Sequence, residues 1–194
     1  VNIYNPLPDF IEIEKTFDHS YILFVGRIVD EVKNISLLLN AYANSVLPEK
    51  EIRLKIVGEG PDEKLLKQKA ETLGISEKVD FIPFTAEVFP YYKNALFSVL
   101  TSYYEGFPRM IIESLSVGTP VVSVDCISGP NEIIISGKNG ILVENQNVEE
   151  LSKAFDKMVT DKDFYANCKA NSKNSVLHLS FENISEAWKQ ILKK

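Results

Sequence analysis

Cysteine, histidine and tryptophan are scarce in this chain, which has two cysteines, two histidines and one tryptophan among its 194 residues. Cys126 and Cys168 are too few for a disulfide framework or a zinc cluster, and we expect both thiols to be reduced in an intracellular protein. His19 and His178 lie outside every motif of the sequence, so neither is a candidate catalytic residue. Without a cluster of histidine and aspartate, the sequence predicts no metal site.

Positive charge and long apolar runs are also in short supply. The chain carries 21 Lys and Arg against 27 Asp and Glu, a net charge of −6. Proteins that bind the phosphate backbone of nucleic acids need a basic face, so we predict no nucleic-acid partner. No apolar run approaches the ~18 residues of a membrane-spanning helix and no signal-peptide pattern appears, so we expect a cytoplasmic protein. The first residue is Val1 rather than Met, and we expect the chain to be either processed or, by preference, a piece of a longer protein.

The chain does contain enough apolar sequence for one α/β domain, since 45% of its 194 residues are hydrophobic. Residues 1–20 are predicted to be an extended lead-in and residues 21–194 the folded domain. Six short, continuous apolar runs predict strands buried on both faces, at Tyr21–Val25, Arg53–Val57, Val79–Ile82, Leu96–Leu100, Pro120–Val124 and Ile141–Val143. Helical patterns lie at Asn34–Ser45, Pro61–Leu73, Glu87–Asn94, Met110–Ser116, Val148–Met158, Asp161–Val176 and Phe181–Lys194. This alternation predicts a doubly wound, Rossmann-like parallel sheet of six strands, with helices on both faces and a helical C-terminal tail.

Ligands of such sheets bind beyond the carboxyl ends of the strands. The first predicted strand ends in Gly26-Arg27, and Lys33 follows six residues after Arg27. Gly26 permits close backbone approach, while the two cations could clamp a diphosphate; the alternative is a turn glycine with two solvated cations. After the second strand, Gly58 begins a Gly-x-Gly turn that lacks the third glycine of a dinucleotide fingerprint. By itself this turn favours a structural role.

The most informative segment runs from Thr101 to Glu113, where two carboxylates bracket a Gly-Phe-Pro turn at the start of an apolar helix. A helix N-terminus favours phosphate, and Pro108 suits the first helical position because its missing N–H costs nothing there. Glu105 and Glu113 would repel phosphate, so we expect them to bind hydroxyls. Phosphate and hydroxyls together indicate a sugar nucleotide. The alternative makes Glu105 the helix N-cap and places Glu113 on a solvated helix face.

Other residues near the strand ends admit a structural explanation. Glu132 could meet a ligand or cap a helix. Tyr103, Tyr104 and Phe107 could stack on a base or sugar, but aromatic residues at a strand end are expected to pack. We expect Cys126 to fill a small buried space rather than act as a nucleophile.

Six motifs follow one another along the chain. They are Gly26-Arg27…Lys33-Asn34, Val57-Gly58-Glu59-Gly60-Pro61, Glu105-Gly106-Phe107-Pro108…Glu113, Gly118-Thr119-Pro120-Val121-Val122, Gly129-Pro130-x-Glu132-Ile133-Ile134 and Gly137-x-Asn139-Gly140-Ile141-Leu142-Val143. In this order they resemble the family 4 (group 1) retaining glycosyltransferases, over roughly residues 1 to 143. The resemblance implies the C-terminal half of a GT-B enzyme. Residues 21–194 would then be its nucleotide-sugar-binding domain, and residues 1–20 the linker from an N-terminal acceptor domain that is absent here.

The resemblance also implies a role for each predicted site residue. Arg27 and Lys33 match the basic pair that neutralises the leaving nucleoside diphosphate. Glu113 matches the carboxylate that binds the ribose hydroxyls, and Glu105 the one beside the donor sugar, which makes Arg27, Lys33 and Glu105 the predicted catalytic residues. Backbone contacts to the donor are implied for Gly106, Phe107, Pro108, Arg109 and Met110, and Gly26 and Gly58 complete the predicted site. The family pattern does not fix Arg109, whose side chain could face the ligand, the missing domain or water. The resemblance implies no metal or other cofactor.

The implied reaction moves a hexose or N-acetylhexosamine, with UDP favoured as the nucleotide, to a glycan or lipid-linked acceptor. The form of the motifs points to bacterial surface polysaccharide synthesis, such as capsule or lipopolysaccharide. Val79–Ile82 runs into Pro83-Phe84 rather than a glycine, and this departure leaves the base open. The full enzyme could lie peripherally on the inner face of the cell membrane, whereas this chain alone is expected to bind nucleotide weakly and transfer no sugar. Alternatives are another GT-B enzyme such as a sugar-nucleotide 2-epimerase, a nicotinamide-dependent Rossmann domain, or a non-catalytic flavodoxin-like domain.

Overall fold

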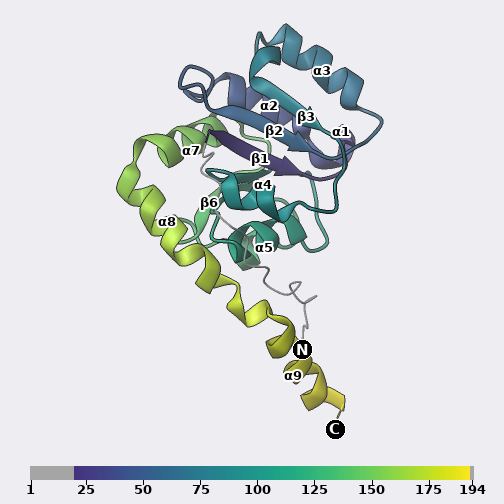
Figure 1. The fold of residues 1–194 in the computed structure, drawn as a ribbon, viewed down its shortest axis with the longest axis vertical. Helices are drawn as coiled ribbons and strands as arrows, with labels where there is room; N and C mark the ends of the chain where they lie inside the picture. Colours follow the sequence, from purple (N-terminus) through teal and green to yellow (C-terminus); the bar gives the residue numbers. More distant parts are fainter. Residues whose placement is uncertain (1–19, 193–194) are drawn as a thin grey trace.

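The computed structural model describes residues 20–192, which form one six-stranded sheet and the helices around it (Figure 1). The strands are β1 (Tyr21–Val25), β2 (Arg53–Val57), β3 (Val79–Ile82), β4 (Ser98–Leu100), β5 (Val121–Val124) and β6 (Gly140–Val143). The helices are α1 (Asp30–Lys33), α2 (Ile35–Ala43), α3 (Glu63–Thr72), α4 (Phe89–Asn94), α5 (Arg109–Ser116), α6 (Pro130–Ile133), α7 (Val148–Thr160), α8 (Lys162–Ser175) and α9 (Phe181–Leu192). The predicted lead-in, apart from Ser20, lies outside the described residues.

All neighbouring strands run parallel, in the order β3-β2-β1-β4-β5-β6. From β1 the chain adds β2 and then β3 on one side, and it then crosses to the other side of β1 to form β4, β5 and β6. The strand order therefore reverses between β1 and β4, which is where ligand crevices form in doubly wound sheets. The predicted six-stranded parallel sheet with a helical tail is confirmed.

The central strand β1 is buried on both faces, as a strand between two helical layers should be. Ile22 and Phe24 belong to the main core cluster, which also contains the buried residues of α2 and α7. Tyr21 and Leu23 belong to a second cluster with Tyr92 of α4. Because successive strand side chains point to opposite faces, this split places α4 on one face of the sheet and α2 and α7 on the other. The continuous apolar run in the sequence thus reflects burial from both sides.

The structure corrects the predicted start of α5. The helix begins at Arg109, and Pro108 is its N-cap rather than its first helical residue. Glu105 is therefore not the helix cap, and this part of the structural alternative is wrong. The strand β4 is also shorter than predicted, although Leu96 N still donates to Tyr21 O at 2.9 Å, so the pairing with β1 extends beyond the strand.

The sequence predicts neither α1 nor α6, because four residues are too few to show a helical period. Contacts from elsewhere fix α1 instead. The Asp62 carboxylate accepts a hydrogen bond from Asp30 N at 2.7 Å, which satisfies an N–H at the start of the helix. Asn34, in the left-handed conformation with φ of 48°, ends it. This short helix carries Lys33, so its boundaries decide where that cation lies.

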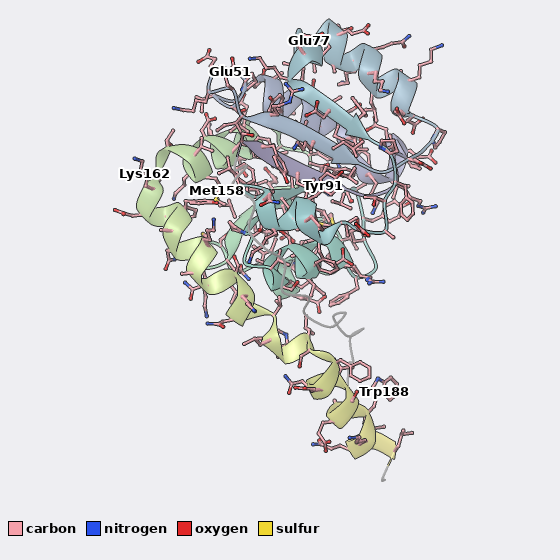
Figure 2. All side chains as sticks on the ribbon, in the orientation of Figure 1. Glu51, Glu77, Tyr91, Met158, Lys162 and Trp188 are labelled. Atoms are coloured by element: carbon pink, nitrogen blue, oxygen red, sulfur yellow. The ribbon has the colours of Figure 1, made fainter. Side chains whose placement is uncertain are left out.

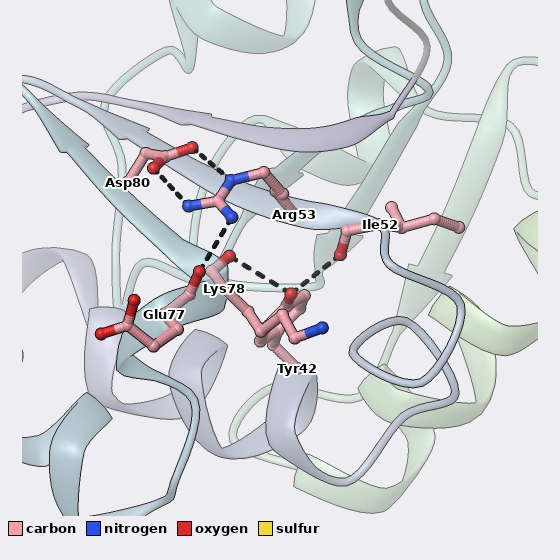
Figure 3. A network of polar contacts seen from close by, with 6 residues as sticks. All are labelled: Tyr42, Ile52, Arg53, Glu77, Lys78 and Asp80. Atoms are coloured by element: carbon pink, nitrogen blue, oxygen red, sulfur yellow. Dashed lines mark hydrogen bonds and ion pairs between the residues drawn. The ribbon is translucent and has the colours of Figure 1, made fainter.

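A polar network ties together the amino ends of β2 and β3 (Figure 3). Arg53 donates from Nε and Nη2 to the two carboxylate oxygens of Asp80, at 2.8 and 2.6 Å, and from Nη1 to Glu77 O at 2.8 Å. The Tyr42 hydroxyl donates to Ile52 O at 2.8 Å. The hydrogen bonds from Arg53 hold the pKa of Asp80 below its usual range. This network lies at the edge of the sheet opposite the carboxyl ends of the strands.

The C-terminal helices form an arm that leaves the body of the protein. α7 packs on α2 and contacts β5 and β6, and α8 then leads to α9, which extends away from the sheet (Figure 1). Within α9 only Ile184 is buried, and Trp188 lies exposed on the arm (Figure 2). The predicted helical tail is thus present to Leu192, and its last two predicted residues lie outside the described part.

Candidate functional site

The carboxyl ends of β1 and β4 place most of the predicted residues at the point where the strand order reverses. β1 leads into Gly26 and Arg27, and β4 leads into the segment that contains Glu105. Gly26 N donates to Val57 O at 3.0 Å, which joins the end of β1 to the end of β2. The three strand ends therefore form one continuous edge, as ligand sites in this class of sheet require.

Gly58 and Gly26 make a close contact between backbones. Gly58 has a φ of +150°, and a Cβ on it would lie 1.9 Å from the carbonyl oxygen of Gly26. Gly60 makes a similar close contact with the backbone after Arg27, since a Cβ on Gly60 would lie 2.1 Å from Ile28 O. No other residue fits at these positions without moving the backbone. The glycine turn thus packs the ends of β1 and β2 together, as the structural interpretation predicts for Gly58.

A pocket of about 520 Å³ opens beside this contact. It is lined by Val25, Gly26, Arg27, Val57, Gly58, Glu59, Phe84, Thr85 and Val88. The size suits a small-molecule ligand, and the walls are largely apolar. Gly26, Arg27 and Gly58 were predicted for the site, whereas Phe84, Thr85 and Val88 were not. The departure at Pro83-Phe84 marked the region, but no pattern in the sequence indicates that these side chains line a pocket.

Lys33 and Glu105 form an ion pair at this edge. Lys33 Nζ donates to Glu105 Oε1 at 2.6 Å, and the Ser102 hydroxyl donates to the same oxygen at 2.6 Å. The side chains of Lys33 and Glu105 are 22% and 14% exposed. The sequence assigned these two residues to different parts of a ligand, and the structure brings them into direct contact. Ser102, which is buried, was not predicted to take part.

Backbone contacts hold the two segments of this ion pair against each other. The Thr101 hydroxyl donates to Lys33 O at 2.9 Å, and Tyr103 N donates to Val32 O at 3.0 Å. On the other side, Glu105 N donates to Ile127 O at 3.1 Å. The loop after β4 is therefore fixed between α1 and the loop after β5. The position of the ion pair follows from the fold rather than from the two side chains alone.

Arg27 differs from Lys33 in having no anionic partner. It is exposed at the wall of the pocket, and within residues 20–192 its side chain makes no hydrogen bond or ion pair. The Lys33 side chain passes nearby, since a Cβ on Gly26 would lie 3.8 Å from Lys33 Cε. The two predicted cations thus flank Gly26. Of the two, Arg27 is the one whose charge is unpaired in the described structure.

Glu113 lies on α5 with its carboxylate largely out of solvent. Its side chain is 16% exposed, and Arg109 Nη2 lies 3.3 Å from Oε1. The Tyr92 hydroxyl donates to Oε2 at 3.2 Å. Burial raises the pKa of Glu113, and the charge of Arg109 and the hydrogen bond from Tyr92 act in the opposite direction. The alternative that places Glu113 on a solvated helix face is therefore wrong, because most of this side chain is out of solvent and its burial raises the pKa.

The segment between the two carboxylates divides into core and surface residues. Phe107 and Met110 pack against the main core, and Pro108 is buried, so close to Gly129 that a Cβ there would lie 2.3 Å from Pro108 Cδ. Gly106 and Arg109 are exposed. A Cβ placed on Gly106 would meet no atom within 4 Å. Ligand contacts in this segment are therefore open to its backbone, to Gly106 and Arg109, and to the exposed parts of Phe107 and Met110, which are half-buried.

The predicted burial is confirmed for some of the residues near the strand ends and wrong for others. Cys126 is buried as predicted, and burial raises the pKa of its thiol to about 11. Phe107 packs, also as predicted. Tyr103 and Tyr104 are exposed, so the prediction that they pack is wrong. They stay at the surface because the loop after β4 turns outward to meet Ile127, with which Tyr104 forms an isolated β-bridge.

Comparison with known proteins decides the family. The family described as group 1 glycosyl transferases matches residues 9–175. The chain belongs to this family of glycosyltransferases. An uncharacterized glycosyltransferase of Haemophilus influenzae is 33% identical over 175 residues, which cover 90% of this chain and 49% of that protein. An alpha-1,4-N-acetyl-D-galactosaminyltransferase of Campylobacter jejuni, named for an undecaprenol-linked acceptor, is 28% identical over 95% of this chain and 51% of its own length.

Solved structures agree on the fold of this group 1 glycosyltransferase chain. The apo form of the lipopolysaccharide outer core galactosyltransferase WaaB superposes with a TM-score of 0.85 at 24% identity, over 99% of this chain and 55% of that one. HepE of Anabaena, in complex with UDP-glucose, superposes with a TM-score of 0.82 at 22% identity, over 91% and 49%. The chain spans about half the length of the relatives named here. Membership of the family removes the nicotinamide-dependent and flavodoxin-like alternatives.

Two further observations concern metals and membranes. In residues 20–192 of this glycosyltransferase chain, no group of three or more His, Cys, Asp or Glu side chains is arranged to hold a metal ion. Over the same residues, none of the helices has both the length and the apolar character needed to cross a bilayer.

Proposed function

We propose that this chain binds the nucleoside diphosphate sugar donor of a retaining glycosyltransferase. The observation that carries the proposal is that four chemically different environments lie at one edge of the sheet. An apolar pocket, an unpaired cation at Arg27, an ion pair at Lys33 and Glu105, and the buried carboxylate Glu113 follow one another there. A base, a diphosphate, a sugar and a ribose need these four environments.

The pocket suits the base, and Glu113 lies where it can serve the ribose. Phe84 and Val88 provide apolar surface in a space of about 520 Å³. Tyr92, which donates to Glu113, packs in the same cluster as Val57 and Val88, and both of these line the pocket. A base in the pocket would therefore bring its ribose toward α5, where Glu113 can accept hydrogen bonds from hydroxyls. UDP is the favoured nucleotide, and HepE of Anabaena, which shares the fold, is described in complex with UDP and with UDP-glucose.

Arg27 and Lys33 would act on the diphosphate. When the bond between the anomeric carbon and the diphosphate breaks, negative charge grows on the leaving phosphate, and fixed cations stabilise that charge without a metal ion. Lys33 has three N–H donors, so it can hold Glu105 and a phosphate oxygen together. Glu105 would then face the donor sugar. The start of α5 would supply backbone N–H groups to the same phosphate.

The acceptor class is supported by the names of the relatives, and one of these names is compatible with retention of configuration. The Campylobacter relative is named for an alpha linkage on an undecaprenol-linked acceptor, and an alpha product from an alpha-linked donor corresponds to retention. A further relative, of Erwinia amylovora, is named for the biosynthesis of amylovoran. We therefore place this chain in the synthesis of bacterial surface polysaccharide, with a hexose or N-acetylhexosamine as the transferred group. The acceptor would bind a further domain of the enzyme, and the enzyme would work in the cytoplasm, at or near the membrane.

The test compares UDP with uridine by NMR titration, which measures weak dissociation constants. Arg27→Ala should weaken UDP about tenfold or more and leave uridine unchanged, because a charge-assisted hydrogen bond to phosphate is lost. Glu113→Gln should weaken both ligands, because both carry the ribose. The matched control is Lys162→Ala, which removes an exposed cation on α8 far from the sheet edge (Figure 2). Tighter binding of NAD than of UDP, or equal losses for UDP and uridine in Arg27→Ala, would contradict the proposal.

A further inference from the structure

Two adjacent hydroxyl residues after β4 hold the two members of the ion pair. The Thr101 hydroxyl donates to the backbone oxygen of Lys33 at 2.9 Å, and the Ser102 hydroxyl donates to the carboxylate of Glu105 at 2.6 Å. Both hydroxyl residues are buried. Successive side chains at the end of a strand point in opposite directions, so one strand end can reach the two partners at once. The ion pair of 2.6 Å closes this group of four.

The two hydrogen bonds on Glu105 meet at a single oxygen. Lys33 Nζ and Ser102 Oγ both donate to Oε1, each at 2.6 Å. Within the described part of the chain, no donor reaches Oε2. Turning the carboxylate would break both bonds at once, and the charge-assisted bonds involved are among the strong ones. Glu105 therefore has one fixed oxygen and one oxygen available to a ligand.

We propose that Ser102 is a positioning residue that, together with Lys33, fixes Glu105 so that Oε2 alone faces the donor sugar. The proposal rests on the proposed function, since it assumes that a nucleotide sugar binds beside Glu105. Ser102 itself touches no ligand, because it is buried behind the carboxylate. Its contribution is to the orientation of Glu105, so its loss should affect the sugar and spare the nucleotide.

Ser114 provides a matched control. It is as fully buried as Ser102 and its hydroxyl also bonds within the protein, to Ser98 Oγ at 2.8 Å and Thr119 O at 3.0 Å. Its partners lie in the core between α5 and β4, away from Glu105. Ser114→Ala should therefore cost stability of the same order as Ser102→Ala. If Ser102 had only a structural role, Ser102→Ala and Ser114→Ala would give the same results in the binding and NMR measurements below.

The first measurement is the affinity gained from the sugar. Dissociation constants are determined by NMR titration for UDP, UDP-glucose, UDP-galactose and UDP-N-acetylglucosamine. The dissociation constant of UDP is divided by that of the sugar nucleotide that binds most tightly, and this ratio is compared between the variants and the unmodified chain. Ser102→Ala should lower this ratio about threefold or more while UDP itself stays within about twofold. Ser114→Ala should leave the ratio unchanged. An unchanged ratio in Ser102→Ala, or no gain from any of the three sugars in the unmodified chain, would overturn the proposal while UDP binding stood.

The second measurement needs no ligand. The carboxyl carbon resonance of Glu105 in a ¹³C-labelled chain reports the hydrogen bonds on that carboxylate. It should move in Ser102→Ala and stay in Ser114→Ala. If it stays in both, Ser102 does not fix Glu105, and the proposal fails whatever the nucleotide does. Failure of the unmodified chain to bind any UDP compound would instead refute the proposed function, and this resonance would still show whether Ser102 holds Glu105.

Discussion

Tyr42 and Tyr92 have no exposed surface, and their hydroxyls serve opposite edges of the sheet. Tyr92 donates to Glu113 at 3.2 Å beside the candidate site, and Tyr42 donates to Ile52 O at 2.8 Å in the network between β2 and β3. Burial, followed by the charge of Glu113, raises the pKa of Tyr92 well above its ordinary value, so its hydroxyl stays protonated and remains a donor. Comparing Tyr42 with Tyr92 therefore distinguishes the effect of a buried hydroxyl on stability from its effect on ligand binding.

Replacing each tyrosine with phenylalanine keeps the ring and removes the hydroxyl. Both Tyr42→Phe and Tyr92→Phe should lower the free energy of unfolding by about 1 kcal/mol, because each removes a part-buried hydrogen bond. Tyr92→Phe should also weaken UDP binding about fivefold, because Glu113 loses a donor that orients its charged form. Urea denaturation and NMR titration measure the two effects. An equal loss of UDP affinity in Tyr42→Phe would show that Tyr92 acts through stability alone.

The pH dependence of binding follows from the same contact. In the proposed binding mode, ribose hydroxyls donate to the ionised carboxylate of Glu113, so UDP affinity should be present above the pKa of this group and fall as the pH drops through it. Burial raises that pKa, and the Tyr92 hydrogen bond lowers it. In Tyr92→Phe the fall should therefore begin at a higher pH. Titrations of UDP across the acid range check the direction of this change, and a shift to lower pH would contradict it.

The charged residues of the candidate site could be predicted from the sequence, whereas the residues that hold them in place could not. Arg27, Lys33, Glu105 and Glu113 stand in motifs at strand ends, where spacing along the chain carries the information. The Tyr92 hydroxyl reaches Glu113 from a different helix. No local pattern marks such a partner, because its place depends on how α4 packs against α5.

Two glycines of the candidate site differ in the space around them: Gly58 is packed against another backbone, whereas Gly106 faces open space. At Gly58 a Cβ would lie 1.9 Å from Gly26 O, and the φ of +150° suits only glycine. Gly58→Ala should therefore lower the free energy of unfolding by about 2 kcal/mol or more, since the ends of β1 and β2 must separate. At Gly106 a Cβ would meet no atom within 4 Å. Gly106→Ala should leave stability unchanged and weaken the sugar nucleotide, because the added methyl group occupies space beside Glu105.

Thermal unfolding and NMR titration of the two glycine variants measure these opposite effects. The melting temperature should fall by about 4 °C or more for Gly58→Ala and by less than about 1 °C for Gly106→Ala. A stable Gly58→Ala protein would show that the strand ends are not held by this backbone contact. Undiminished binding of the sugar nucleotide by Gly106→Ala would remove Gly106 from the site.

The elements themselves were predictable where they were long or buried on both faces. The six strands lie where continuous apolar runs occur, because a parallel sheet covered on both sides admits apolar residues at every position. α1 and α6 were missed because each has only four residues, too few to show a helical period. The missed helix α1 matters for the site, because it carries Lys33 toward Glu105. Its formation depends on Asp62, which follows β2, and on the left-handed Asn34.

The molecule as a whole divides its polar interactions between two edges of one sheet. At the carboxyl edge, Arg27 has no partner within residues 20–192, and the carboxylates are partly satisfied. At the amino edge, Arg53 makes three hydrogen bonds, two of them to Asp80 (Figure 3). Unsatisfied charge at one edge is typical of a binding site, whereas satisfied charge at the other is typical of a structural contact. The division follows from the topology, which sends all strand ends of one kind to one edge.

Asp80→Asn tests this division. The variant should lose about 0.5–1 kcal/mol of stability at neutral pH, a modest amount because both side chains are about one-third exposed and solvent screens the pair. The hydrogen bonds from Arg53 lower the pKa of Asp80. Its contribution is therefore present above the ordinary pKa of aspartate and is lost as the pH falls through the lowered value. The stability difference between the two proteins should shrink below about pH 4.

Urea denaturation at several pH values measures this difference, and UDP titration supplies the control. UDP affinity should be the same in both proteins, because the network and the site lie at opposite edges. A constant stability difference down to about pH 2 would contradict the assignment to Asp80. Reduced UDP affinity in the variant would show that the two edges are energetically coupled.

The backbone contact between Gly26 and Gly58 also limits how the ligand preference of this fold can be altered. At Gly58 the end of β2 touches the end of β1 through its main chain, so no side chain can be added at this glycine without separating β1 from β2. The lining of the pocket also includes Phe84, Thr85 and Val88, which follow β3. Libraries designed to change which nucleotide is accepted should therefore vary these three positions and keep both glycines constant.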